Sequence, residues 1–179
     1  MNRLPWLFTA ANVLLFQVGW AVAVLLGSKW ALCYTVTASA LHFWKSHSPR
    51  FDLLSALLLV VLGIVHDSLL LNSGILIIGE ARVPPIWLMA IWFLMGLTLN
   101  HSLKFIYERW IWSAVLGSMG SVFAYSAGVK LSGASWGVFG FWGLACVAAL
   151  WVFVLPLHKV LMSNYLAGPG RVVNRGSAQ

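Results

Sequence analysis

One acidic residue, Asp67, lies deep in an apolar stretch of the sequence, between His66 and Ser68. If residues 51–72 form a helix, Asp67 lies roughly 24 Å from its start, at 1.5 Å per residue. An ionised carboxylate in the middle of a bilayer costs about 2.5–3.5 kcal/mol on insertion scales. We therefore expect Asp67 to be protonated, paired or beside a wet cavity, with Gln17 as a partner at similar depth. Two roles stay open: a functional carboxylate, which we favour, or a hydrogen-bonded clasp between helices.

A second polar group lies near the other end of the apolar stretches. Thr98, Asn100 and His101 come close together late in the stretch 85–106, and His42 falls near the end of 30–44. Thr98 and His101 would share one face of a helix at a spacing of three residues. We expect His42 and His101 to line one pocket that faces the cytoplasm. The alternative is that each histidine is an ordinary hydrogen-bonded side chain at the membrane interface.

Several chemistries that such residues could support are excluded by spacing. Five scattered histidines do not form the paired histidine boxes of membrane di-iron enzymes. The sequence contains neither an H-E-x-x-H motif, nor a phosphate-binding P-loop, nor a G-x-S-x-G nucleophile motif. Cys33 and Cys146 are predicted to be packing residues. We expect no metal ion and no cofactor, with a haem held by His42 and His101 as the alternative, and whether the protein is an enzyme stays open.

The elements that position these residues follow from composition. Of 179 residues, 61% are hydrophobic and 8% are charged, whereas a soluble domain is about 25% charged. This excludes a soluble enzyme and a disordered chain. Because a spanning helix needs roughly 20 apolar residues, we predict an all-α, polytopic membrane helix bundle over residues 1–162, followed by a basic, flexible tail over 163–179. The predicted spans are 4–26, 30–44, 51–72, 85–106, 110–129 and 134–157.

The basic residues predict the orientation of these six spans. Eight lie on the side of the termini and three on the other side, which predicts that both termini are cytoplasmic. The eight are Arg3, Lys45, Arg50, Lys104, Arg109, Lys159, Arg171 and Arg175; the three are Lys29, Arg82 and Lys130. They form no run, so we expect contacts with lipid headgroups and none with nucleic acid.

The other three acids are expected at the edges of the bundle. Asp52 and Glu108 fall at predicted cytoplasmic edges and Glu80 falls in an outer loop. We expect all three to be solvated, and Glu108 to pair with Lys104 four residues earlier.

Small residues recur at a spacing of four in the last two spans. Gly120, Ala124 and Gly128 lie in the fifth, and Gly133 and Gly137 begin the sixth. Such rows let helices approach closely in a membrane. They predict packing of the two spans on each other, or alternatively a homodimer through the same faces.

Two segments resemble a known family. They are His66-Asp67-Ser68 with Gly74, and Thr98-Leu99-Asn100-His101-Ser102-Leu103 after Trp87-Leu88 and Trp92-Phe93. Both are similar to an uncharacterised, domain-of-unknown-function family of small bacterial inner-membrane proteins. The resemblance covers nearly the whole chain and implies a multi-pass protein of the inner membrane. Members of that family are often encoded near cyclopropane-type fatty-acid modifying enzymes, which implies a role in lipid chemistry.

Three functions therefore stay open. The first, which we favour, is a membrane component of fatty-acyl or lipid modification, which binds an acyl chain or recruits soluble lipid-modifying enzymes. In this function His101, Asn100 and Thr98 would hold the polar end of the lipid. The second is a small permease or proton-coupled carrier with Asp67 as its titrating group. The third is a structural assembly subunit.

Overall fold

The apolar stretches form helices in the computed structural model of the protein, which describes residues 5–167. The two ends of the chain lie outside the described residues, so the predictions for Arg3, Arg171 and Arg175 lie there too. The elements in chain order are α1 (Pro5–Lys45), α2 (Pro49–Asn72), β1 (Leu76–Ile77), α3 (Ile86–Gly96), α4 (Lys104–Tyr107), α5 (Trp110–Ser132), β2 (Ser135–Trp136), a 3-10 turn η1 (Gly140–Trp142) and α6 (Gly143–Ala167). The all-α class is confirmed, and the two short strands add only a small antiparallel pair, with Leu76 opposite Trp136.

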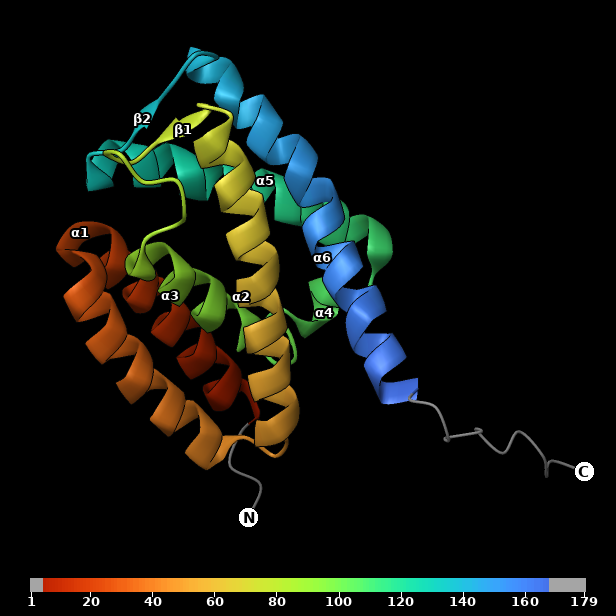
Figure 1. Cartoon of the computed structure of the whole chain (residues 1–179). Coiled ribbons are helices and arrows are strands. Elements are labelled where there is room, and N and C mark those ends of the chain that lie inside the picture. Colours follow the sequence, from red (N-terminus) through yellow and green to blue (C-terminus); the bar gives the residue numbers. More distant parts are fainter. Residues whose placement is uncertain (1–4, 168–179) are drawn as a thin grey trace, which may run out of the picture.

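The helix α1 is a hairpin of two antiparallel arms, which Figure 1 shows side by side. The chain reverses at Gly27, which has φ 75° and ψ −169° inside an otherwise helical segment. Glycine reaches this positive φ without the steric cost that a Cβ would add. The first two predicted spans, 4–26 and 30–44, are therefore the two arms of α1.

The prediction of one continuous helix over residues 85–106 is wrong. The helix α3 ends at Gly96, and residues 97–103 form turns before the short α4. Gly96 packs so closely on α2 that a Cβ at this position would overlap the backbone of Ala56. Thr98 Oγ1 donates to the Met95 carbonyl at 2.6 Å, and the hydroxyl thus stabilises a local turn. Polar side chains that compete for the backbone in this way favour turns over helix.

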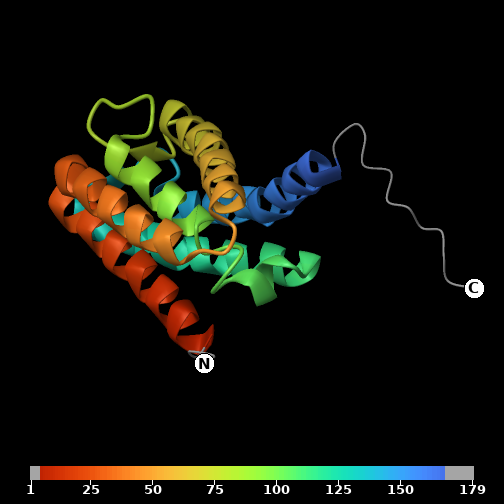
Figure 2. The same ribbon diagram turned by 90° about the horizontal axis from the view of Figure 1, so that it is seen from below.

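The arrangement places α3 between α1 and α2, as Figure 2 shows from below. The helices α5 and α6 pack on each other, and α5 runs across the bundle (Figure 1). Gly117 of α5 lies against Leu155 of α6, and Ser118 Oγ donates to the Ala148 carbonyl at 2.9 Å. The two helices thus pack on each other as predicted, but through Gly117 and Ser118; the predicted row Gly120, Ala124 and Gly128 lines a cavity instead, and the homodimer stays a prediction.

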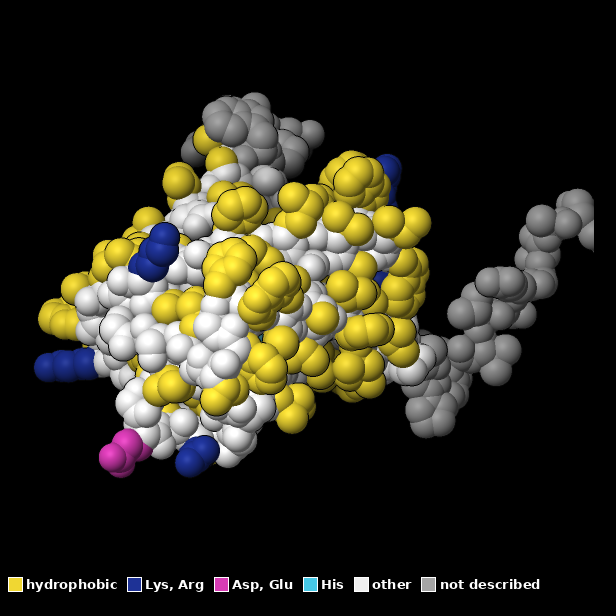
Figure 3. All heavy atoms as spheres, turned by 90° about the horizontal axis from the view of Figure 1, so that it is seen from above, with side chains coloured by type: hydrophobic (Ala, Val, Ile, Leu, Met, Phe, Trp, Pro, Cys, Tyr) yellow, Lys and Arg dark blue, Asp and Glu magenta, His cyan; other side chains and the backbone are white. Residues whose placement is uncertain are grey.

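The surface is that of a membrane protein. Among the described residues, three helical segments are long and apolar enough to cross a membrane: Leu7–Lys45, which is the hairpin of α1, Pro49–Asn72 and Gly140–Tyr165. Large apolar side chains are exposed on many elements, and Figure 3 shows them spread over one face with a few lysines and arginines at its rim. Six crossings and cytoplasmic termini stay predictions.

The last helix lies further along the chain than the predicted span 134–157, because it begins only at Gly143. The helix α6 continues to Ala167, five residues beyond the predicted end of the bundle at residue 162. The remainder of the expected tail lies outside the described residues.

Candidate functional site

The prediction that Asp52 is a solvated edge residue is wrong, because Asp52 is fully buried, at 0% exposure. It lies in the first turn of α2, which begins at Pro49. Proline suits the first helical position because its missing N–H is not needed there. The chain turns from α1 into α2 within a few residues, and this turn places the Asp52 carboxylate against the last turn of α1.

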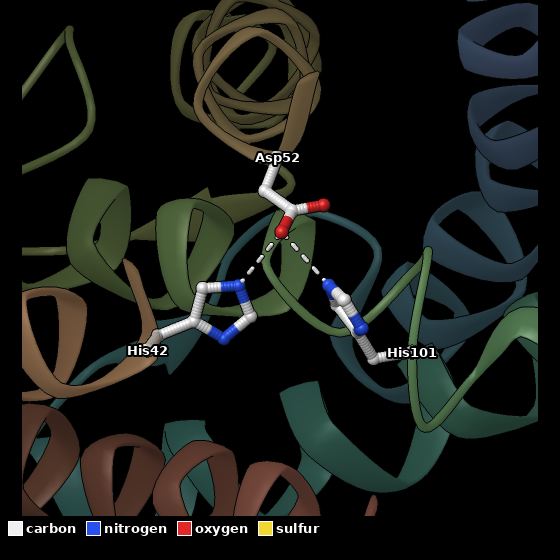
Figure 4. A group of neighbouring side chains, drawn as sticks. All are labelled: His42, Asp52 and His101. Atoms are coloured by element: carbon white, nitrogen blue, oxygen red, sulfur yellow. Dashed lines mark hydrogen bonds and ion pairs between the residues drawn. The ribbon is translucent and has the colours of Figure 1, made fainter. Parts of the chain in front are cut away.

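His42 and His101 both contact the same oxygen of Asp52 (Figure 4). His42 Nε2 lies 3.1 Å and His101 Nε2 lies 2.8 Å from Asp52 Oδ2. The two imidazole ring centroids are 5.0 Å apart. The prediction that these two histidines come together is thus met by the geometry, with Asp52 as the group that joins them. Because the carboxylate stands between them, this arrangement leaves no space for a porphyrin, and the haem alternative loses its support.

Further polar side chains complete the surroundings of Asp52. Ser46 Oγ donates to Oδ2 at 2.5 Å, and Asn100 Nδ2 donates to Oδ1 at 3.2 Å. Thr98, which the sequence grouped with Asn100 and His101, is buried but bonds to its own turn instead. We call the group of His42, Ser46, Asp52, Asn100 and His101 the Asp52 cluster.

Asn12 of α1 contacts His42 on the ring nitrogen that does not face Asp52. Its Nδ2 lies 3.3 Å from His42 Nδ1 and donates to the Leu97 carbonyl at 3.3 Å. Its Oδ1 accepts a hydrogen bond from Ser102 Oγ at 2.6 Å. Since Asn12 presents its NH2 group to His42 Nδ1, that nitrogen accepts, and the ring proton of His42 lies on Nε2, directed at Asp52.

Asp67 forms a separate buried cluster nearer the other end of α2, also at 0% exposure. Its Oδ2 accepts a hydrogen bond from Trp92 Nε1 at 2.7 Å, and its Oδ1 accepts one from the Tyr125 hydroxyl. His66 Nδ1 lies 2.8 Å from the same Oδ1. We call Asp67 with these three donors the Asp67 cluster. Of the three states expected for Asp67, the structure has the paired one.

The partners of Asp67 differ from the expected Gln17. Gln17 is exposed and lines the cavity described below, while Trp92 of α3 and Tyr125 of α5 bond the carboxylate. Ser68, the third member of the sequence motif, gives its backbone carbonyl to Asn72 Nδ2 at 2.8 Å. Tryptophan and tyrosine were missed because each also fits an ordinary apolar packing position.

A third polar contact links α6 to the rest of the bundle and was not expected. His158 is fully buried; its Nε2 donates to the Ser55 carbonyl at 3.0 Å, and the Tyr107 hydroxyl donates to its Nδ1 at 2.8 Å. Burial raises the pKa of the Tyr107 hydroxyl well above its usual range. With both ring nitrogens satisfied in this way, His158 is neutral and structural.

The remaining two acids follow the sequence prediction. Glu80 and Glu108 are exposed. Glu108 Oε1 lies 3.7 Å from Lys104 Nζ in the predicted i, i+4 pair.

An apolar cavity of about 460 Å³ lies among α1, α3, α5 and α6. Its volume is within the range of roughly 300–1,000 Å³ for small-molecule sites. Trp92, Tyr125 and Trp151 line it, so the cavity adjoins two of the donors of the Asp67 cluster. Gly120 and Gly128 line it from α5, and a Cβ at either position would meet no atom within 4 Å. These two glycines keep space open, in contrast with Gly117, which packs on α6.

Two polar atoms of this lining are buried without a hydrogen-bond partner in the described structure. They are the hydroxyl Oγ of Ser132 and the indole Nε1 of Trp151, which lies near the Tyr125 hydroxyl but outside regular hydrogen-bond geometry. A buried donor without a partner costs about 1–3 kcal/mol. A ligand with an acceptor oxygen would satisfy either atom.

Fold and site together define an all-α protein with apolar helices suited to a membrane, two buried Asp–His clusters and one apolar cavity. The chain belongs to the family described as "Protein of unknown function (DUF2878)", whose model matches residues 9–157. The matched range includes both clusters and every residue that lines the cavity. No curated protein and no solved structure matches the chain.

Proposed function

We propose that this membrane protein binds the acyl chain of a lipid in the cavity among α1, α3, α5 and α6, as a membrane component of fatty-acyl or lipid modification. The observation that carries the proposal is the chemistry of the lining. The polar side chains in it are those of Gln17, Ser121, Tyr125 and Ser132; the rest are apolar residues, tryptophans and glycines. Such a surface favours hydrocarbon, because burial of apolar area contributes about 25 cal/mol per Å².

The unpartnered atoms of the lining support a ligand that also carries oxygen. Trp151 Nε1 is a donor only, so its partner must be an acceptor, such as a carboxylate or an ester carbonyl. An acyl chain with its carboxyl or ester group meets both requirements: hydrocarbon for the walls and an acceptor for the indole. The sequence had assigned the polar end of the lipid to Thr98, Asn100 and His101, but none of these residues lines the cavity.

The alternative of a proton-coupled carrier has less support. Two of the three donors to Asp67, Trp92 and Tyr125, do not exchange protons near neutral pH, and the third is its neighbour His66. This arrangement favours the clasp over a titrating group that exchanges protons with an open path. The carrier function predicts that Asp67→Asn abolishes pH-dependent uptake into vesicles, whereas acyl binding in the cavity predicts no uptake to abolish.

A fatty acid with a photoactivatable group tests the proposal in purified protein. Gly120→Phe would place a ring in the cavity, because Gly120 lines it and an added Cβ there meets no atom within 4 Å. Met119→Phe is the matched control, since Met119 is exposed on the same helix and does not line the cavity. We expect labelling of α5 to fall at least tenfold in Gly120→Phe and to stay unchanged in Met119→Phe. Equal labelling of both variants and the native protein would contradict acyl binding in this cavity.

A further inference from the structure

We propose that His42, Asp52 and His101 form a binding site for a divalent transition-metal ion of the zinc type. The three ligand atoms are His42 Nε2, Asp52 Oδ2 and His101 Nε2, all within 4.8 Å of one another. They come from three separate segments: the end of α1, the start of α2 and the turn after α3. Figure 4 shows both rings directed at the carboxylate. The site is distinct from the acyl cavity, whose lining contains none of the three residues.

The donor set selects the class of ion. Two imidazoles with one carboxylate are the protein ligands of many catalytic zinc sites and of non-haem iron sites, which keep further positions open for water or substrate. Magnesium and calcium prefer ligand sets made of oxygen atoms, so they fit these residues poorly. Zinc–nitrogen distances are about 2.0–2.1 Å, so two ligand atoms on one ion lie no more than about 4.2 Å apart. A small approach of the two rings therefore closes the site.

The electrostatics of the Asp52 cluster favour a cation. Asp52 is fully buried, and the described structure gives it no lysine or arginine partner. Removal of a carboxylate from water costs several kcal/mol, which neutral hydrogen bonds offset only in part. Asn100 Nδ2 holds the other oxygen, Oδ1, so Oδ2 is kept toward the two imidazoles. A divalent ion in place of the two ring protons would neutralise the carboxylate directly.

Metal binding at His42 requires a change of tautomer that Asn12 can accommodate. Without metal, the proton of His42 is on Nε2 and Asn12 Nδ2 faces Nδ1. With metal on Nε2, the proton moves to Nδ1, so the ring stays neutral and no net proton is lost. The Asn12 amide then turns so that its Oδ1 accepts from His42 Nδ1 and its Nδ2 donates to Ser102 Oγ; this turn gives up the Nδ2 bond to the Leu97 carbonyl. Outer groups that orient metal-bound histidines in this way contribute about 10–100-fold to affinity.

His101 gives the site its access to solvent. Its side chain is 15% exposed, whereas those of His42 and Asp52 are at 2% and 0%. Lys104 and the turn at Lys45 lie at the same end of the bundle, which the basic residues predict to be cytoplasmic. An ion would thus enter beside His101, and the open coordination position would face the same side.

The test is a titration of purified, chelator-stripped protein in detergent with Zn²⁺ against a chromophoric chelator, and with Co²⁺ followed by visible absorption. We expect one ion per chain, with affinity at least 100-fold weaker in His101→Ala and Asp52→Asn and roughly tenfold weaker in Asn12→Ala. His47→Ala is the matched control, because His47 is exposed in the loop next to the site and should leave affinity unchanged.

The metal site and the acyl cavity can be tested independently, because each has a variant that should not affect the other. Photolabelling should not change in His101→Ala, and zinc affinity should not change in Gly120→Phe. If a variant elutes as aggregate, the Co²⁺ spectrum of the native protein decides alone, since nitrogen and oxygen ligands in a tetrahedral site give an intense visible band. Absence of binding to the native protein, or equal affinity in His101→Ala and His47→Ala, would overturn the proposal.

Discussion

The two ends of α2 each bury one aspartate beside histidine, yet the two clusters differ in what their donors can do. Asp67 is held by the imidazole of its neighbour His66 and by Trp92 and Tyr125, which reach it from α3 and α5. Asp52 is held by two imidazoles, from α1 and from the turn after α3. An indole N–H has no lone pair to offer, whereas an imidazole nitrogen can release its proton and bind a cation. Asp52 thus has two imidazoles on one oxygen, whereas Asp67 has one, so among the described residues only the Asp52 cluster offers three ligands for a cation.

Loss of the Asp67 carboxylate should have the largest effect on stability. Asp67→Ala leaves three buried donors without their acceptor, each at roughly 1–3 kcal/mol, so we expect a loss of about 3 kcal/mol or more. The measurement is chemical unfolding in detergent, followed by tryptophan fluorescence. A loss below about 1 kcal/mol would show that the Asp67 cluster is no clasp and would weaken the contrast with Asp52.

Gly63 should be intolerant of a side chain because it packs against a member of the clasp. A Cβ at Gly63 would overlap the indole of Trp92, the donor to Asp67. Overpacking of this kind costs about 1–3 kcal/mol, which we expect for Gly63→Ala in thermal unfolding. The control is Gly120→Ala, where space is open; the higher helix propensity of alanine should make it neutral or stabilising. Equal effects of both variants would argue against a fixed Trp92.

Removal of one hydroxyl should have a smaller effect. Tyr125→Phe deletes a single hydrogen bond to Asp67. Such bonds between membrane helices contribute about 0.6–1.7 kcal/mol, and we expect a loss in this range in unfolding experiments. Tyr165→Phe is the control, since Tyr165 is exposed on α6. A loss as large as that of Asp67→Ala would mean that the hydroxyl alone holds the cluster.

The surface pair Lys104–Glu108 should matter least. Both side chains are 60% exposed and their charged atoms are 3.7 Å apart. Exposed i, i+4 pairs contribute about 0.3–0.5 kcal/mol, so Lys104→Met should change stability by no more than this in chemical unfolding. A larger loss would place Lys104 among the groups that stabilise the nearby Asp52 cluster.

Composition and the lengths of the apolar stretches were sufficient to predict a helical membrane protein. They also predicted the two arms of α1, α2 and α5 to within a few residues, whereas α6 begins nine and ends ten residues later than the predicted span 134–157. The fourth stretch failed because its polar residues after Gly96 stabilise turns, which hydropathy alone does not detect. The presence of Thr98, Asn100 and Ser102 within five residues was the available signal for such a turn.

The site was predicted in part, by depth along the helices. The position of each residue along its predicted helix placed His42 and His101 at a similar depth. The same reasoning placed Asp52 at a solvated edge, because a carboxylate just after Pro49 is common in the first turn of a helix. Two histidines directed at one pocket need an acceptor, and Asp52 was the acid nearest in the sequence to His42; that was the signal that could have found it. His158 and the donors Trp92 and Tyr125 depend on contacts between distant segments, which a single sequence does not reveal.

The most direct test of the contrast between the two carboxylates is thermal unfolding of Asp52→Asn and Asp67→Asn, each with and without Zn²⁺. With zinc at 100 times its dissociation constant, a site that binds only the folded state adds about 2.7 kcal/mol, or roughly 5–10 °C in a chain of this size. We predict this rise in the native protein and in Asp67→Asn, whose midpoint is lower throughout, and no rise in Asp52→Asn. An equal rise in Asp52→Asn, or a rise lost only in Asp67→Asn, would contradict the account.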